Sequence, residues 1–118
     1  MKGWQADGDV TVSNGDRRTD TQVSDAYSVR FRPPQMPGAV ITRTAYAAAY
    51  TRDPDQFLVL VETEWASPGR TELAYDARFE EETWRTAAEA DEEARRVAAD
   101  LLEDAGSLDW DGQPAAPR

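Results

Sequence analysis

Apolar and polar residues alternate in four runs of the chain, and each run predicts a β-strand. The clearest is the run at residues 57–66, where strong strand formers occupy every second position: Phe57, Val59, Val61, Thr63 and Trp65. In a pleated strand these side chains all project from one face. The other three runs span about residues 26–32, 39–51 and 71–79, and segments rich in proline, glycine or aspartate separate them.

The three connections are short enough to join neighbouring antiparallel strands. Four cross-strand pairs would bring the large apolar residues of all four strands to one face: Phe31–Val40, Tyr46–Val61, Tyr50–Phe57 and Trp65–Thr71. A slip of one residue in any hairpin would move a whole strand's side chains to the other face. We therefore predict an antiparallel β-meander in this register, with a four-residue turn at residues 52–55.

A helix over about residues 87–105 is predicted to cover the apolar face. Its small and apolar residues recur at helical spacing and form one stripe: Ala87, Ala94, Val97, Ala98, Leu101, Leu102 and Ala105. Thr86 and Glu89 have the spacing of a capping box, in which each side chain bonds the other residue's backbone N–H. Gly106 is suited to ending the helix. The predicted fold class is α+β, a four-stranded antiparallel β-meander packed on one C-terminal α-helix.

The two ends of the chain are predicted to lie outside this single domain of residues 26–105. Residues 1–25 hold few large apolar groups, so we expect a mostly flexible segment, in which residues 10–12 can add a short edge strand. Residues 106–118 are expected to form a flexible acidic tail. Both tails are thus predicted to be disordered.

The outer face of the predicted sheet turns apolar beside the 52–55 turn. Five residues form this putative interface: Ala45, Ala47, Ala49, Leu58 and Leu60. A contiguous apolar patch on a surface is a candidate subunit or partner interface. Coverage by the N-terminal segment, through Trp4, Val10, Val12 or Val23, is the equally weighted alternative.

Composition limits the classes of function. The 118 residues include 23 acidic and 13 basic ones, which gives a net charge of −10. Because nucleic acids and anionic membranes are also negatively charged, we do not expect the protein to bind them directly. The chain has no cysteine and no histidine, which excludes thiol catalysis and removes the commonest general base and metal ligand. With no apolar run long enough for a membrane helix and no signal peptide, a cytoplasmic location is expected.

Much of the negative charge lies in residues 79–105, which hold ten acidic residues and three arginines. The candidate acidic surface of the helix comprises Glu89, Asp91, Glu92, Glu93, Asp100, Glu103 and Asp104. A rigid row of carboxylates can imitate a nucleic-acid backbone. A solvated outer helix face accounts for the same run, and is the commoner case.

Signals for other sites are weak. Arg30, Arg32 and Arg43 could contact a nucleic acid, but the predicted register places them as cross-strand partners of Glu62 and Glu64, with Arg43 facing Glu64. The acidic fragments at residues 53–55 and 109–112 lack the further oxygen ligands of a calcium loop. We therefore predict no catalytic, metal or cofactor site, and no cofactor.

The segment Trp84–Ala90, which follows the strands, resembles the sheet-to-helix junction of AP2-type and integrase arm-binding domains. The resemblance covers these seven residues and the order of elements. It implies a basic sheet face that reads DNA, and the acidity of this chain departs from that pattern. Fold-level likeness alone does not transfer a function.

We therefore expect a small acidic, non-enzymatic protein-binding or accessory module that can form a homodimer through the outer sheet face. The partner is expected to be a protein, with no membrane involved. The alternative is an acidic nucleic-acid mimic that inhibits a DNA- or RNA-binding protein, as mobile elements and phages encode. A sheet-plus-helix nucleic-acid-binding module is the further alternative.

Overall fold

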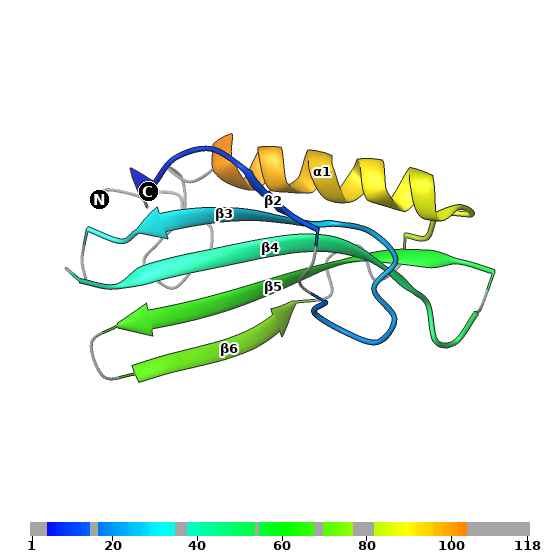
Figure 1. Cartoon of the computed structure of the whole chain (residues 1–118), viewed down its shortest axis with the longest axis horizontal. Coiled ribbons are helices and arrows are strands. Elements are labelled where there is room, and N and C mark those ends of the chain that lie inside the picture. Colours follow the sequence, from blue (N-terminus) through cyan, green and yellow to red (C-terminus); the bar gives the residue numbers. More distant parts are fainter. Residues whose placement is uncertain are drawn as a thin grey trace, which may run out of the picture.

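The computed structural model of the protein describes residues 5–14, 17–34, 38–53, 55–67, 70–76 and 82–103. Within these ranges the chain forms an antiparallel sheet of six strands with one helix across one face (Figure 1). The elements are β1 (Gln5–Ala6), β2 (Thr11–Ser13), β3 (Ala26–Arg32), β4 (Val40–Ala49), β5 (Phe57–Ser67), β6 (Arg70–Asp76) and α1 (Ala87–Glu103). The predicted α+β class, a four-stranded meander on a C-terminal helix, is confirmed. The predicted C-terminal tail lies outside the described residues.

The core lies between α1 and the sheet, as the alternating pattern of two strands predicts. In β3, Tyr27, Val29 and Phe31 are buried, and in β5 Val59 and Val61 are buried on the same side. The helix contributes Val97 and Leu101, together with a row of fully buried alanines: Ala90, Ala94 and Ala98. Small side chains let the helix backbone approach the sheet closely, so the aromatic residues of the strands fill the remaining space.

The predicted register is wrong by one residue in all three hairpins. Ala49 pairs with Phe57, Ala45 with Val61, Phe31 with Ile41, and Trp65 with Glu72. The β4–β5 loop explains the first error. The Tyr50 amide donates to the Gln56 carbonyl at 3.0 Å, which closes a loop of residues 51–55 in place of the predicted four-residue turn.

This shift reverses the two faces of β4. Ile41, Ala45 and Ala47 lie toward the helix, while Tyr46 and Ala48 lie on the outer face. Alternation could not select between these arrangements, because β4 carries apolar residues at both odd and even positions. Arg43 likewise lies beside Thr63, to whose hydroxyl it donates at 3.2 Å, and not opposite Glu64.

The helix begins at the predicted cap, with a different bonding pattern. The Glu89 amide donates to the Thr86 hydroxyl oxygen at 3.1 Å, as a helix N-cap requires. The Thr86 hydroxyl also donates to the Glu89 carboxylate at 3.0 Å. This contact replaces the expected bond from the Glu89 side chain to the backbone of Thr86.

The N-terminal segment, which was expected to be mostly flexible, contributes to the sheet. β1 and β2 both pair with β3, and a bend at Gly8, whose φ is 89°, separates them. Residues 21–23 then continue along β4 beyond the start of β3, where the Val23 amide donates to the Ala47 carbonyl at 2.9 Å. The Ser24 hydroxyl accepts a hydrogen bond from the Ala47 amide and so fills a gap in this ladder.

Candidate functional site

The outer face of the sheet carries a second, smaller apolar cluster. Ala26, Tyr46 and Ala48 are buried there, and Leu60 packs against them partly exposed. The segment at residues 17–23 runs beside these residues, with Gln22 bridged to Ala48. We call this group the outer cluster. Of the two explanations for an apolar outer face, coverage by the N-terminal segment therefore applies here. Val10, Val12 and Val23 do not belong to the cluster, and Trp4 lies outside the described residues.

An ion pair fastens this segment to the sheet. The Arg18 guanidinium lies 3.1 Å from the Glu62 carboxylate, which is only 4% exposed, whereas the Arg18 side chain is 24% exposed. The Arg18 amide also donates to the Gln22 side-chain oxygen. Glu62 therefore has Arg18 as an ionic partner, a contact between residues 44 positions apart that the sequence pattern did not indicate.

The putative interface does not form one surface. Ala45 and Ala47 are fully buried on the helix side, because the register shift moves them there, so they cannot contact a partner across the outer face. Ala49, which has the same parity as these two residues, and the outer-face residues Leu58 and Leu60 remain partly exposed. Together with four other residues they line a hollow of about 260 Å³, the outer-face hollow: Thr21, Ala49, Tyr50, Thr51, Arg52, Leu58 and Leu60.

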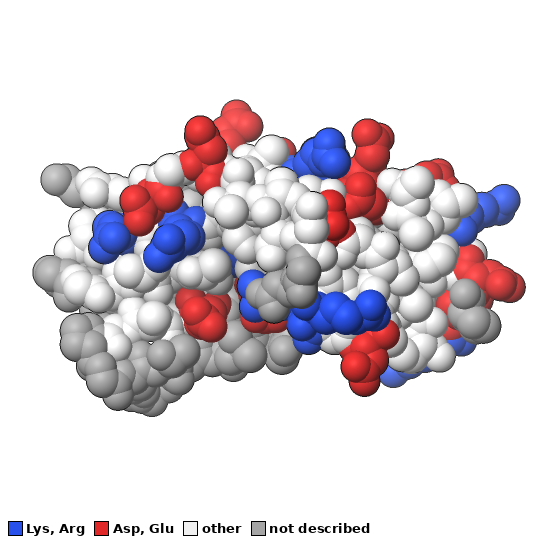
Figure 2. Space-filling view, in the orientation of Figure 1, with Lys and Arg blue, Asp and Glu red and all other residues white. Residues whose placement is uncertain are grey.

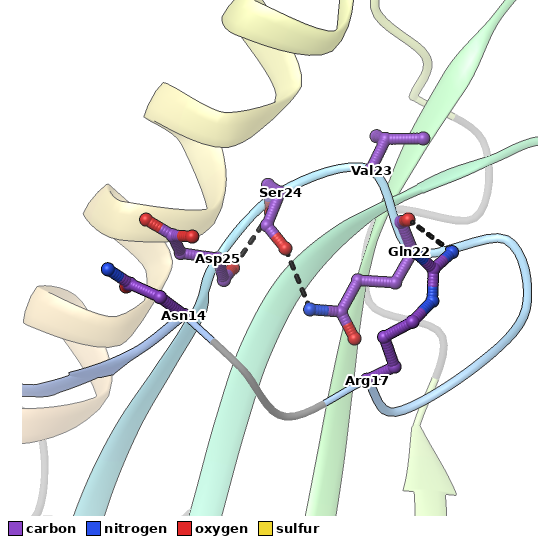
Figure 3. A pocket seen from close by; sticks show the side chains of 6 residues that line it. All are labelled: Asn14, Arg17, Gln22, Val23, Ser24 and Asp25. Carbon is purple, nitrogen blue, oxygen red and sulfur yellow. Dashed lines mark hydrogen bonds between the residues drawn. The ribbon is translucent and has the colours of Figure 1, made fainter.

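A larger hollow of about 530 Å³ lies beside the start of β3 and is lined by Asn14, Arg17, Gln22, Val23, Ser24 and Asp25 (Figure 3). Its polar groups bond one another. The Gln22 side chain donates to the Ser24 carbonyl at 2.7 Å, and Arg17 donates to the Gln22 carbonyl at 3.2 Å. These bonds hold the loop in shape, and they occupy groups that a polar ligand would otherwise bind.

The candidate acidic surface is partly neutralised. Figure 2 shows acidic side chains over α1 with basic side chains between them. Glu89, Glu92 and Glu103 are exposed. Arg96 interrupts the row, since it forms ion pairs with Glu93 and with Asp100, the latter at 3.1 Å. The last predicted member of the surface, Asp104, lies outside the described residues.

Asp91, a predicted member of the acidic surface, binds a core residue. It accepts a 2.5 Å hydrogen bond from the buried Tyr27 hydroxyl, while the Arg95 guanidinium lies 5.4 Å from the centre of the Tyr27 ring. The pKa of Tyr27 is raised above its usual value of 10.0, mainly by burial and to a smaller extent by the hydrogen bond to Asp91. Arg95 remains exposed, and its contact with Tyr27 raises its own already high pKa. This cluster joins β3 to α1.

The three arginines of the predicted cluster separate. Arg30 and Arg32 are exposed on β3, and Arg32 lies 3.3 Å from the Asp7 carboxylate. Arg43 lies on the helix side of β4. Among the described residues, no group of three or more acidic side chains is placed to hold a metal ion. No helix in the described ranges is long and apolar enough to cross a membrane.

Sequence reasoning missed Arg18, Tyr50 and Arg52. Arg18 is next to another arginine in a polar segment, and nothing in that local pattern indicates a carboxylate on β5. The predicted register places Tyr50 in the core, and the pattern at residues 52–55 predicts only a turn for Arg52. Comparison of the chain with protein-family models, with curated proteins and with solved structures gave no match.

Proposed function

We propose that the protein is a small acidic, non-enzymatic protein-binding module whose partner is bound at the outer-face hollow. The supporting observation is that Tyr50, Leu58 and Leu60 are partly exposed around one concave site, whereas the neighbouring apolar residues of the outer cluster are buried. Aromatic and aliphatic groups around a pocket commonly anchor a partner's side chain.

The size and lining of the hollow favour a protein side chain as its occupant. Its volume of about 260 Å³ is below the roughly 300–1,000 Å³ of ordinary small-molecule sites. One or two apolar side chains of a partner fit this space. The exposed Arg52 at its edge suits a carboxylate beside that apolar group. The partner class is therefore a protein segment with an apolar anchor next to an acidic residue.

Affinity capture with three forms of the chain tests this proposal. Leu58→Ser removes an apolar wall of the hollow, and Val23→Ser removes an exposed apolar side chain outside it. We expect a protein from an extract of the source organism to be retained by the wild type and by Val23→Ser, and lost with Leu58→Ser. Far-UV circular dichroism checks that both variants fold.

Two results would contradict the proposal. One is an identical set of captured proteins from all three forms, and the other is no captured protein at any salt concentration. The partner at the hollow can also be a second copy of the chain, which is the homodimer that the sequence analysis expects through the outer sheet face. In that case light scattering should show a dimer of the wild type that Leu58→Ser abolishes.

An acidic nucleic-acid mimic is the second candidate function. It is supported by the exposed Glu89, Glu92 and Glu103 on α1, and weakened by Arg96, which neutralises the centre of the row. A mimic should capture a nucleic-acid-binding protein through Glu92 and Glu103, with binding that weakens steeply as salt is raised. Capture that resists both salt and the double change Glu92→Gln/Glu103→Gln would exclude it.

A further inference from the structure

One edge of the sheet ends in a continuous strand with no neighbour among the described residues. β6 pairs with β5 over all seven residues from Arg70 to Asp76 and is the last strand in the sheet order. Its other side carries backbone N–H and C=O groups that no described residue engages. Such an edge can pair with another strand.

The opposite edge is built differently. There β1 and β2 hold only two and three residues, and the bend at Gly8 separates them. Short, interrupted edge strands are a common means of preventing edge-to-edge pairing. β6 has neither an interruption nor a proline, so it is the better of the two edges for adding a strand (Figure 1).

Backbone geometry restricts how two β6 edges can pair. Alternate residues of a strand direct their backbone groups to opposite sides, so the residues that face away from β5 all have the same parity. Two copies related by a two-fold axis must therefore place each residue opposite one of equal parity. The arrangements with extensive overlap are centred on residue 72, 73 or 74.

The sequence of β6 selects one of these three arrangements. Centring on residue 72 places Glu72 opposite Glu72, and centring on residue 74 places Glu72 opposite Asp76; both juxtapose like charges. Centring on Leu73 pairs all seven residues and places Arg70 opposite Asp76 twice, once at each end. This arrangement has opposite charges in register and no like charges directly opposed.

We propose that β6 is a self-association edge, at which two copies of the chain pair antiparallel about Leu73 to form one continuous sheet. The site is separate from the outer-face hollow. Its partner is a second copy because the strand is complementary to itself in charge. The contact is small, so the dimer is weak, and the net charge of −10 on each copy makes it stronger when salt screens the repulsion.

A charge exchange tests the register. Sedimentation or light scattering at about 10 µM to about 1 mM, in about 0.5 M salt, should show the wild-type mass rising from 13.1 kDa toward twice that value. Arg70→Asp and Asp76→Arg should each weaken association by about tenfold, because two symmetric pairs become repulsive. The combined variant should restore association. A wild type that stays monomeric, or a combined variant no better than the single ones, would overturn the proposal.

Introduced thiols test the same geometry without altering charge, and the chain has no cysteine of its own. Leu73→Cys places two thiols opposite each other, with Cα atoms roughly 4.5–5.5 Å apart, within disulfide range. Thr71→Cys places the thiols roughly 13 Å apart along the strand, which prevents a bond. Rapid cross-linking of the first variant alone is expected, and equal cross-linking of both would overturn the proposal.

The hollow and the edge can be distinguished. Leu58→Ser should leave β6 self-association and the Leu73→Cys cross-link unchanged, since Leu58 lies outside the paired part of β5 and β6. Loss of the dimer in that variant would assign self-association to the hollow and overturn the edge proposal.

Discussion

Two buried polar side chains join separate parts of this molecule. Tyr27, which is 1% exposed, ties β3 to α1 through Asp91. Glu62, which is 4% exposed, ties β5 to the N-terminal segment through Arg18. Buried polar groups of this kind are costly when a partner is removed, so they should contribute more to stability than exposed ion pairs on α1.

Tyr27→Phe should lower the free energy of unfolding at neutral pH by about 1 kcal/mol, the typical net value of one hydrogen bond. It should also change the response to alkali. The pKa of Tyr27 is raised in the folded state, so its stabilising effect is complete below the unfolded value of 10.0 and is lost as the pH rises through the folded value. Urea unfolding followed by tryptophan fluorescence, from neutral pH to above 10.0, measures both effects.

The variant should therefore lose less stability than the wild type above that pH. Equal losses in the two proteins would show that Tyr27 does not ionise in the way its burial implies.

Arg18→Met should destabilise the fold by about 1–3 kcal/mol, because it leaves the Glu62 carboxylate buried without this partner. The second change Glu62→Leu should recover much of that loss, since an apolar pair can replace a buried ion pair. Arg17→Met is the matched control. Arg17 is exposed and bonds only carbonyls of its own loop among the contacts described, so its loss should cost less. Chemical denaturation compares the wild type, Arg18→Met, the double variant and Arg17→Met, and a double variant no more stable than Arg18→Met would contradict the expected recovery.

At the scale of elements, the closeness of α1 to the sheet depends on three alanines. Ala90, Ala94 and Ala98 have no exposed surface, and they repeat every four residues along the face that meets β3, β4 and β5. The helix could be predicted from this spacing and from its cap at Thr86. Its contact residues on β4 could not, because they depend on the register of two hairpins.

Ala94→Leu should destabilise the protein by about 1–3 kcal/mol, because the added atoms have no space between helix and sheet. Ala99→Leu introduces the same side chain on the exposed side of the same helix and should change stability by less than about 0.5 kcal/mol. Thermal and urea unfolding of both variants provide the comparison. If Ala99→Leu reduced stability more than Ala94→Leu, then Ala99 and not Ala94 would lie on the face of the helix that meets the sheet.

At the scale of the whole molecule, the chain carries a net charge of −10. Some acidic residues of α1 have arginine partners, but Glu89, Glu92 and Glu103 are exposed on the same surface. Like charges on a small domain repel one another, and salt reduces that repulsion beyond a distance of about 10 Å at 0.1 M.

The melting temperature should therefore rise as sodium chloride increases from about 0.01 M to about 0.5 M, over which the screening length falls severalfold. Differential scanning calorimetry at constant pH measures the shift. The variant Glu92→Gln/Glu103→Gln should show a smaller rise, because it removes two of the exposed charges. A melting temperature that falls with salt would mean that attractive ion pairs outweigh the net repulsion.

The sequence by itself determined the helix, the four main strands and the faces of β3 and β5. Alternation placed Tyr27, Val29 and Phe31 of β3 and Val59 and Val61 of β5 in the core, because a strand with one apolar face allows one arrangement. Helical spacing placed Ala94, Val97 and Ala98 against them. These are local periodicities, and they can be read without knowing what lies opposite.

The tertiary structure alone decided the faces of β4 and the composition of the outer-face hollow. β4 is apolar at both parities, so the length of the 51–55 loop, and not the strand's own pattern, set which residues meet the helix. The Arg18–Glu62 pair and the coverage of Tyr46 and Ala48 likewise join segments distant in sequence. Such contacts depend on where the chain returns in space, which no local pattern specifies.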